Sequence, residues 1–129
     1  MIRLVHARDG ATAVEFAVIL PLFFVLVFTS IEFARFYWVR STVQFAVEEA
    51  ARYAMVSGGD DAAITKRARD RASTLDQKSL TVEVEREVSG GVAYVAVEAR
   101  YDWPSAAFTG FFPSDLRYAT GRARVPLVN

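Results

Sequence analysis

The chain has 129 residues, enough for one small domain, and its 15 Lys and Arg side chains balance 15 Asp and Glu side chains. The zero net charge provides no overall field that would attract nucleic acid or an anionic membrane. The absence of cysteine excludes a disulfide framework and any thiolate metal site.

The first predicted element is an apolar segment close to the N-terminus. Residues 16–31, FAVILPLFFVLVFTSI, carry no formal charge, and residues 11–14 lengthen the run if Glu15 is tolerated. A hydrocarbon core about 30 Å thick takes roughly 20 helical residues, so the segment spans a membrane only with Glu15 near one interface. A cleaved secretory signal fits less well, because the bulky residues 36–38 stand where a cleavage motif needs small ones.

The helical pattern continues past the apolar segment until Ser57-Gly58-Gly59, which predicts its end. Glu48 and Arg52 have the i,i+4 spacing of a favourable ion pair. Pro21 removes one backbone hydrogen bond and predicts either a simple kink or a weak point at which the helix stretches. The positions expected to pack against other elements recur every three or four residues: Phe36, Val39, Val43, Ala46, Ala50 and Tyr53.

A short second helix is predicted after the glycines, with Asp60 or Asp61 as its N-cap. Its apolar stripe comprises Ile64, Ala68, Ala72 and Leu75. Its basic residues are Lys66, Arg67, Arg69 and Arg71. We expect them to form a solvated face rather than a nucleic-acid site, because acidic residues dilute them and no aromatic residue is interleaved for base stacking.

Three strands complete the predicted fold. Apolar and polar residues alternate over 80–85, Ser89-Gly90-Gly91 predicts a turn, and residues 92–103 form a second strand, so the two strands make a β-hairpin. Both faces of the second strand are apolar, which leaves the register open. Residues 116–127 predict a third strand ended by Pro126. Phenylalanines of the loop before it either plug the edge of the core or form a subunit contact or lipid-interface belt: Phe108, Phe111 and Phe112.

No pattern of catalytic or ligand-binding residues is present. The sequence has no phosphate-binding glycine loop, metal-ligand cluster or nucleophile elbow, and its single histidine, His6, lies before the apolar segment. A hydrolase needs a base beside its nucleophile. We therefore expect no enzyme activity, no catalytic residue, no cofactor, no metal, and neither nucleic acid nor a small-molecule substrate as a partner.

Glu15 is compatible with a purely structural role. Thr12-x-x-Glu15 matches a capping box, in which the Thr12 side chain accepts from the Glu15 N–H and the carboxylate reaches back to the N–H of Thr12. A carboxylate in the first turn also complements the positive end of the helix dipole. This interpretation gives the residues before Thr12 no role.

The string GATAVEF, residues 10–16, resembles the processing site of type IV pilin-like proteins. The longer run through residue 54 resembles more narrowly the TadE-like family of the tight-adherence (Tad, or Flp) pilus system. The segments that carry this resemblance are AVEFAVILP, IEFAR and EEAARYA. It covers about the first 55 residues strongly, and beyond Ser57 it is only an agreement of length and expected strand content.

The resemblance implies a prepilin leader, residues 1–10, which prepilin peptidase removes after Gly10. Ala11 then becomes the N-terminus, and Glu15 and Phe16 serve in peptidase recognition and subunit pairing. A long helix over residues 11–57, about 11–33 of it in the membrane, leads to a head domain over 58–129. The implied class is α+β and pilin-like: a long transmembrane and amphipathic helix, a short second helix and a three-stranded antiparallel sheet.

The implied function is that of a minor pilin or pseudopilin required for assembly of an adhesive pilus. The protein would be a single-pass protein of the bacterial inner membrane, with its C-terminal domain in the periplasm and available for incorporation into the pilus. Its partners would be prepilin peptidase, other pilins, Tad/Flp assembly proteins and inner-membrane lipid. The alternative is an uncleaved, signal-anchored envelope scaffold in which Thr12 and Glu15 are a plain cap.

Overall fold

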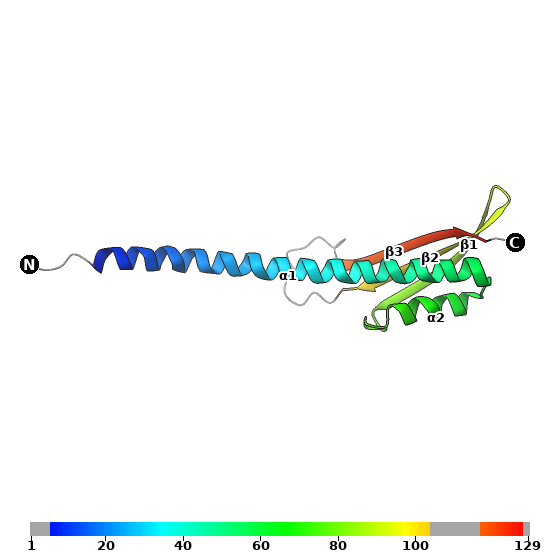
Figure 1. The fold of residues 1–129 in the computed structure, drawn as a ribbon, viewed down its shortest axis with the longest axis horizontal. Helices are drawn as coiled ribbons and strands as arrows, with labels where there is room; N and C mark the ends of the chain where they lie inside the picture. Colours follow the sequence, from blue (N-terminus) through cyan, green and yellow to red (C-terminus); the bar gives the residue numbers. More distant parts are fainter. Residues whose placement is uncertain (1–5, 104–116, 128–129) are drawn as a thin grey trace, which may run out of the picture. The chain divides into compact units, whose positions relative to one another are not determined.

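The computed structural model describes residues 6–103 and 117–127, with side chains from Gly10 onward. Its elements are α1 (His6–Ser57), α2 (Asp61–Arg71), β1 (Leu80–Ser89), β2 (Val92–Asp102) and β3 (Tyr118–Pro126) (Figure 1). The chain divides into an N-terminal unit, residues 1–35, and a compact unit, residues 36–129, which we call the head domain. The expected α+β class, with one long helix, one short helix and a three-stranded antiparallel sheet, is confirmed.

The described residues of the N-terminal unit form the first part of α1, which begins at His6, whereas the long helix was expected from Ala11. Thr12 therefore lies inside the helix, and the expected capping box with Glu15 is wrong for the intact chain, because an N-cap residue has a non-helical backbone. Helix extension adds one hydrogen bond for each residue, while a single glycine such as Gly10 lowers helix stability by only about 1 kcal/mol. The helix also continues through Pro21.

By length and composition, α1 is a helix that could cross a membrane, as an anchor or as a signal sequence. None of its most apolar stretch is buried within the structure. Apolar side chains point outward on every face of this stretch, which is typical of a helix surrounded by lipid or by other helices.

In the head domain, α1 and α2 lie side by side over one face of the sheet (Figure 1). The residues of α1 that enter the core follow one stripe of the helix: Val39, Val43, Ala46, Val47, Ala50, Ala51 and Ala54. They pack against the inward-facing side chains of the sheet, which include Val95, Val97, Ala99 and Ala119. Small alanines on the helix stripe allow a close approach between the two layers.

Helix α2 begins with the expected N-cap, because Asp60 Oδ1 accepts a hydrogen bond from the N–H of Ala63 at 2.8 Å. The expected apolar stripe is confirmed, since all four members are buried: Ile64, Ala68, Ala72 and Leu75. Ala72 is the C-cap, and Leu75 lies beyond the end of the helix. The buried apolar stripe therefore continues past the end of α2 into the segment that leads to β1.

The sheet has the order β1-β2-β3, and both neighbouring pairs are antiparallel. Gly90 and Gly91 have φ values of 59° and 80°, so they form the two-residue turn of the expected hairpin. The register pairs Leu80 with Tyr101, and on the other side of β2 Tyr118 pairs with Asp102. The predicted loop residues lie outside the described part of the chain: Phe108, Phe111 and Phe112.

Long side chains of the neighbouring strands cover the face of β2 that points away from the helices. Ala96 is buried although it points away from the helices. On the same face, the guanidinium of Arg124 lies 4.1 Å from the centre of the Tyr94 ring and bonds Glu87 at 3.2 Å. These long side chains flank Ala96 in the register and cover it.

Candidate functional site

The residues predicted for cleavage and pairing lie together on the first turns of α1. Gly10, Ala11, Glu15 and Phe16 are all exposed. A Cβ atom built on Gly10 lies within 4 Å of no atom beyond the adjacent residues and the backbone of its own helical turns, so the position has room for a side chain. Because α1 starts before this segment, the bond between Gly10 and Ala11 is helical in the intact chain.

The apolar residues that follow form a continuous outward-facing surface. Phe16 is 63% exposed and Leu22 69%. Three phenylalanines make contacts along the helix itself: Phe23 with Phe24 at 6.0 Å between ring centres, and Phe24 with Phe28 at 6.2 Å. Such a surface is unfavourable in water, so it requires lipid or another protein around it.

The residues predicted for helix packing lie where α1 belongs to the head domain. Val39, Val43, Ala46 and Ala50 are fully buried, whereas Phe36 and Tyr53 are half-buried at the edge of the core. The ring of Phe36 contacts that of Trp103 edge to face, with 6.5 Å between centres. The packing stripe of α1 is therefore used within the subunit itself.

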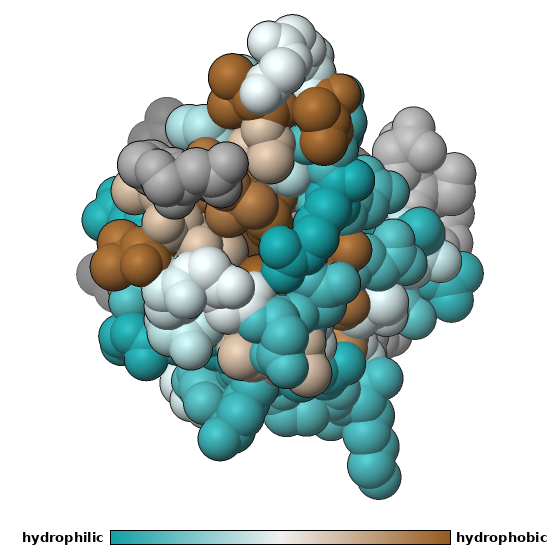
Figure 2. All heavy atoms as spheres, turned by 90° about the vertical axis from the view of Figure 1, so that its right-hand side faces the viewer, coloured by the Kyte–Doolittle hydropathy of each residue, from teal (hydrophilic) through white to brown (hydrophobic). Residues whose placement is uncertain are grey.

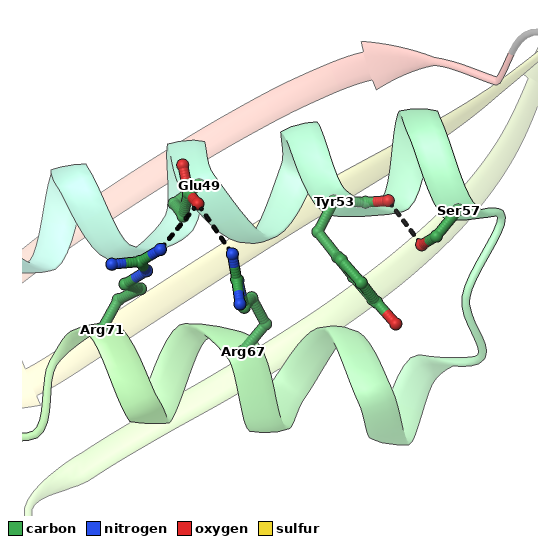
Figure 3. A network of polar contacts seen from close by, with 5 residues as sticks. All are labelled: Glu49, Tyr53, Ser57, Arg67 and Arg71. Carbon is green, nitrogen blue, oxygen red and sulfur yellow. Dashed lines mark hydrogen bonds and ion pairs between the residues drawn. The ribbon is translucent and has the colours of Figure 1, made fainter.

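A polar clamp joins α1 to α2, and its centre is Glu49 (Figure 3). One carboxylate oxygen of Glu49 accepts from Arg67 at 3.0 Å and from Arg71 at 3.1 Å. The hydrogen bond from Arg67 is the main cause that lowers the pKa of Glu49; the charge of Arg71 adds to it, and partial desolvation opposes both. We call these three residues the Glu49 clamp.

The Glu49 clamp changes the interpretation of the basic cluster on α2. Arg67 and Arg71 bind a carboxylate of α1 instead of facing only solvent, and Arg69 donates to the Gln77 carbonyl. The sequence did not reveal this role, because Glu49 lies on α1 and Arg67 on α2, and no local spacing relates residues on two different helices. The one available signal was that these arginines are four residues apart and so share a helix face.

The expected ion pair between Glu48 and Arg52 is not found among the described residues. Glu48 instead accepts from the side chain of Gln44 at 2.8 Å. The neighbouring acids Glu48 and Glu49 therefore have different partners, as expected for adjacent helix positions that point about 100° apart.

The outer face of α1 in the head domain keeps exposed aromatic side chains. Tyr37, Trp38 and Phe45 are more than half exposed. Tyr37 and Phe45 line an open groove of about 500 Å³, together with Gln44 of α1 and Thr120 of β3. This surface is available to a partner, which sequence periodicity alone did not single out.

The comparison with protein families decides what the N-terminal helix is. A family model described as TadE-like protein matches residues 10–52. Residues 10–52 form a TadE-like domain. The resemblance seen in the sequence is thus confirmed for about a third of the chain. The rest of the chain, including α2 and the sheet, lies outside the match.

The TadE-like domain begins at Gly10, the residue predicted to precede the cleavage site, and it contains Glu15, Phe16 and Glu49. No curated protein and no solved structure matches the chain. Within residues 10–103 and 117–127, no group of His, Asp and Glu side chains is arranged to hold a metal ion.

Proposed function

We propose that the protein is a minor pilin or pseudopilin required for assembly of a Tad/Flp-type adhesive pilus. The observation that carries the proposal is the TadE-like domain over residues 10–52, whose apolar part is not covered by any of the residues that the structure describes. In this proposal α1 stores the subunit in the inner membrane with the head domain in the periplasm. It later packs among other pilins.

Prepilin peptidase is proposed to cut after Gly10 and to leave Ala11 as the N-terminus. A protease holds the bond that it cuts in an extended form, whereas this bond is helical in the intact chain. Cleavage therefore requires the first turns of α1 to unwind. Glycine favours this step, because it is about 1 kcal/mol less stable in a helix than alanine.

The new ammonium of Ala11 explains the presence of a carboxylate at Glu15. The two residues are separated by one helical turn, about 6 Å of axial rise. At 4 Å, an ammonium and a carboxylate attract by about 4 kcal/mol at an effective dielectric of 20, before desolvation reduces the gain. Pairing between adjacent subunits is heterologous and would set their axial stagger, which suits an open helical filament.

The test is the N-terminus of the protein isolated from cells with active prepilin peptidase. Mass spectrometry should find Ala11 as the first residue, and a Gly10→Leu variant should accumulate as precursor. Co-purification with pilus components should accompany the mature form only. An intact Met1 on the membrane-bound protein would instead favour the uncleaved, signal-anchored scaffold, in which the substitution of Gly10 has no effect.

A further inference from the structure

Two adjacent aromatic side chains, Tyr37 and Trp38, stand exposed on the first turn of α1 within the head domain. Tyr37 is 70% exposed and Trp38 is 53% exposed. Their neighbours Phe36 and Val39 pack into the head domain on the opposite side of the helix. Tyr37 and Trp38 are therefore not part of the core, and large rings of this kind are favourable where one end is apolar and the other is wet.

The position of this pair in the sequence indicates what covers it. If α1 spans the membrane, as in the proposed function on which this step rests, roughly 20 residues lie in the hydrocarbon core. The run from Ala11 to Ile31 has that length, with Glu15 as its one charged residue, and the charged residues Glu32 and Arg35 follow it. Tyr37 and Trp38 then fall at the level of the lipid headgroups, where both residue types are enriched in membrane proteins.

Two exposed arginines lie at the same end of the head domain. Arg40 follows the aromatic pair on α1, and helix side chains tilt toward the N-terminus, here toward the membrane. Arg117 precedes β3, and its carbonyl accepts from the N–H of Trp103 at 3.0 Å. The Trp103 ring contacts Phe36. The Nε of Arg117 lies 3.9 Å from Oδ1 of Asp102.

We propose that this end of the head domain rests in the headgroup layer of the bilayer that α1 crosses. We call it the proximal surface, made of Tyr37, Trp38, Arg40 and Arg117. The aromatic rings would enter the carbonyl region while their O–H and N–H groups stay among polar atoms. The guanidinium groups would contact lipid phosphates. The stored subunit then has its head domain docked on the membrane surface.

The opposite end of the head domain has a different character. It carries the C-terminal end of α1 and the β1–β2 turn, and hydrophilic side chains cover most of it, with separate hydrophobic spots (Figure 2). Exposed apolar residues of these elements are Val56, Val88 and Val92, which are aliphatic. This end has no exposed Tyr–Trp pair among the described residues, as expected for an end that faces water.

The depth of Trp38 can be measured in the full-length protein, because the chain has only two tryptophans. A Trp103→Phe variant leaves Trp38 as the only indole. The protein is inserted into vesicles of phosphatidylcholine and phosphatidylglycerol whose acyl chains carry bromine near the headgroup or near the methyl end. We expect Trp38 fluorescence to be quenched at least about twofold more by the shallow bromines.

A matched variant separates this proposal from the proposed function. Phe24→Trp, made together with Trp38→Phe and Trp103→Phe, places the only indole in the middle of the apolar stretch. It should be quenched most by the deep bromines. If Phe24→Trp is quenched but Trp38 is not, the proximal surface does not touch lipid and the inference is overturned. If neither is quenched, α1 does not insert and membrane storage itself is wrong.

A second measurement does not depend on replacing Trp103. The chain has no cysteine, so Ser41→Cys and Arg52→Cys each provide one site for a spin label on the same face of α1. With the headgroup layer at Tyr37, the label at position 41 should be less accessible to a water-soluble nickel complex than the label at position 52. Equal accessibility at the two sites, in the inserted protein, would contradict the docked head domain.

Discussion

The side chain of Gln44 on α1 binds both backbone polar groups of Arg122 on β3. Its Nε2 donates to the Arg122 carbonyl at 3.3 Å, and its Oε1 accepts from the Arg122 N–H at 3.2 Å. Since β3 pairs with β2 on its other side, Gln44 occupies the free edge of the sheet in place of another strand. The part of α1 within the head domain is thereby attached to the sheet by more than apolar packing.

The close approach behind this contact depends on Gly121. A Cβ atom at this position would lie 2.9 Å from Gln44 Cα and 3.0 Å from Gln44 N, both backbone atoms. Gly121→Ala should therefore push β3 and α1 apart and lower the free energy of unfolding by about 1–3 kcal/mol. The measurement is denaturant unfolding of the detergent-solubilised full chain, followed by near-UV circular dichroism.

Thr120→Ser provides the control for Gly121→Ala, because Thr120 is the exposed neighbour on the same strand. Its effect should stay within about 0.5 kcal/mol, as is usual for surface positions. If Gly121→Ala were as stable as the wild type, the result would contradict the close approach of Gly121 to the Gln44 backbone.

The Glu49 clamp predicts an acid-sensitive contact between α1 and α2. The pKa of Glu49 lies below its ordinary value of 4.5 in the folded protein. The contribution of Glu49 to stability is therefore fully present above that value and is lost as the pH falls through the lower, folded pKa. Thermal unfolding should show that Glu49→Gln is less stable than wild type at neutral pH and that the difference shrinks on acidification.

Glu48→Gln is the matched control for this clamp, since it removes the adjacent carboxylate but leaves both arginine contacts of Glu49. It should keep the acid sensitivity that Glu49 confers. A constant difference between Glu49→Gln and wild type at all pH values would contradict an ionic role for Glu49.

The proposed processing after Gly10 should respond to helix stability as well as to side-chain size. Gly10→Ala adds a methyl group with no neighbour within 4 Å, so it causes no clash, yet it stabilises the helix by about 1 kcal/mol. If unwinding precedes cleavage, pulse-chase analysis should show processing about fivefold slower than in wild type. A Val18→Leu variant, which leaves the cleavage segment intact, should be processed at the wild-type rate.

Pairing of Glu15 with the Ala11 ammonium predicts a defect in assembly rather than in membrane insertion. Glu15→Gln removes the charge at nearly constant size, so the membrane fraction should be unchanged. Co-purification of the mature protein with pilus components should fall about tenfold, which corresponds to roughly 1.4 kcal/mol. Unchanged co-purification of correctly processed Glu15→Gln would leave no role for the proposed pair.

Local patterns were sufficient for most of the fold because each depends on residues close in the chain. The outward-facing apolar run, the Asp60 cap and the Gly90-Gly91 turn are of this kind. In the intact chain α1 begins at His6, because the cap signal at Thr12 does not stop helix propagation. The boundary at Ala11 applies to the cleaved chain and stays a prediction. The confirmed TadE-like match likewise rests on a single continuous segment.

The sequence by itself thus determined a helix long and apolar enough to cross a membrane, the types and order of the elements, and the family match of residues 10–52. Only the tertiary structure decided the partners of Glu49, the burial of Ala96 and the contact of Gln44 with β3. These features join residues up to 78 positions apart, and no local periodicity records such a separation. All three features arise only when the helices and the sheet pack. Polar groups that become covered, such as those of Glu49 and Gln44, must then find partners on other elements.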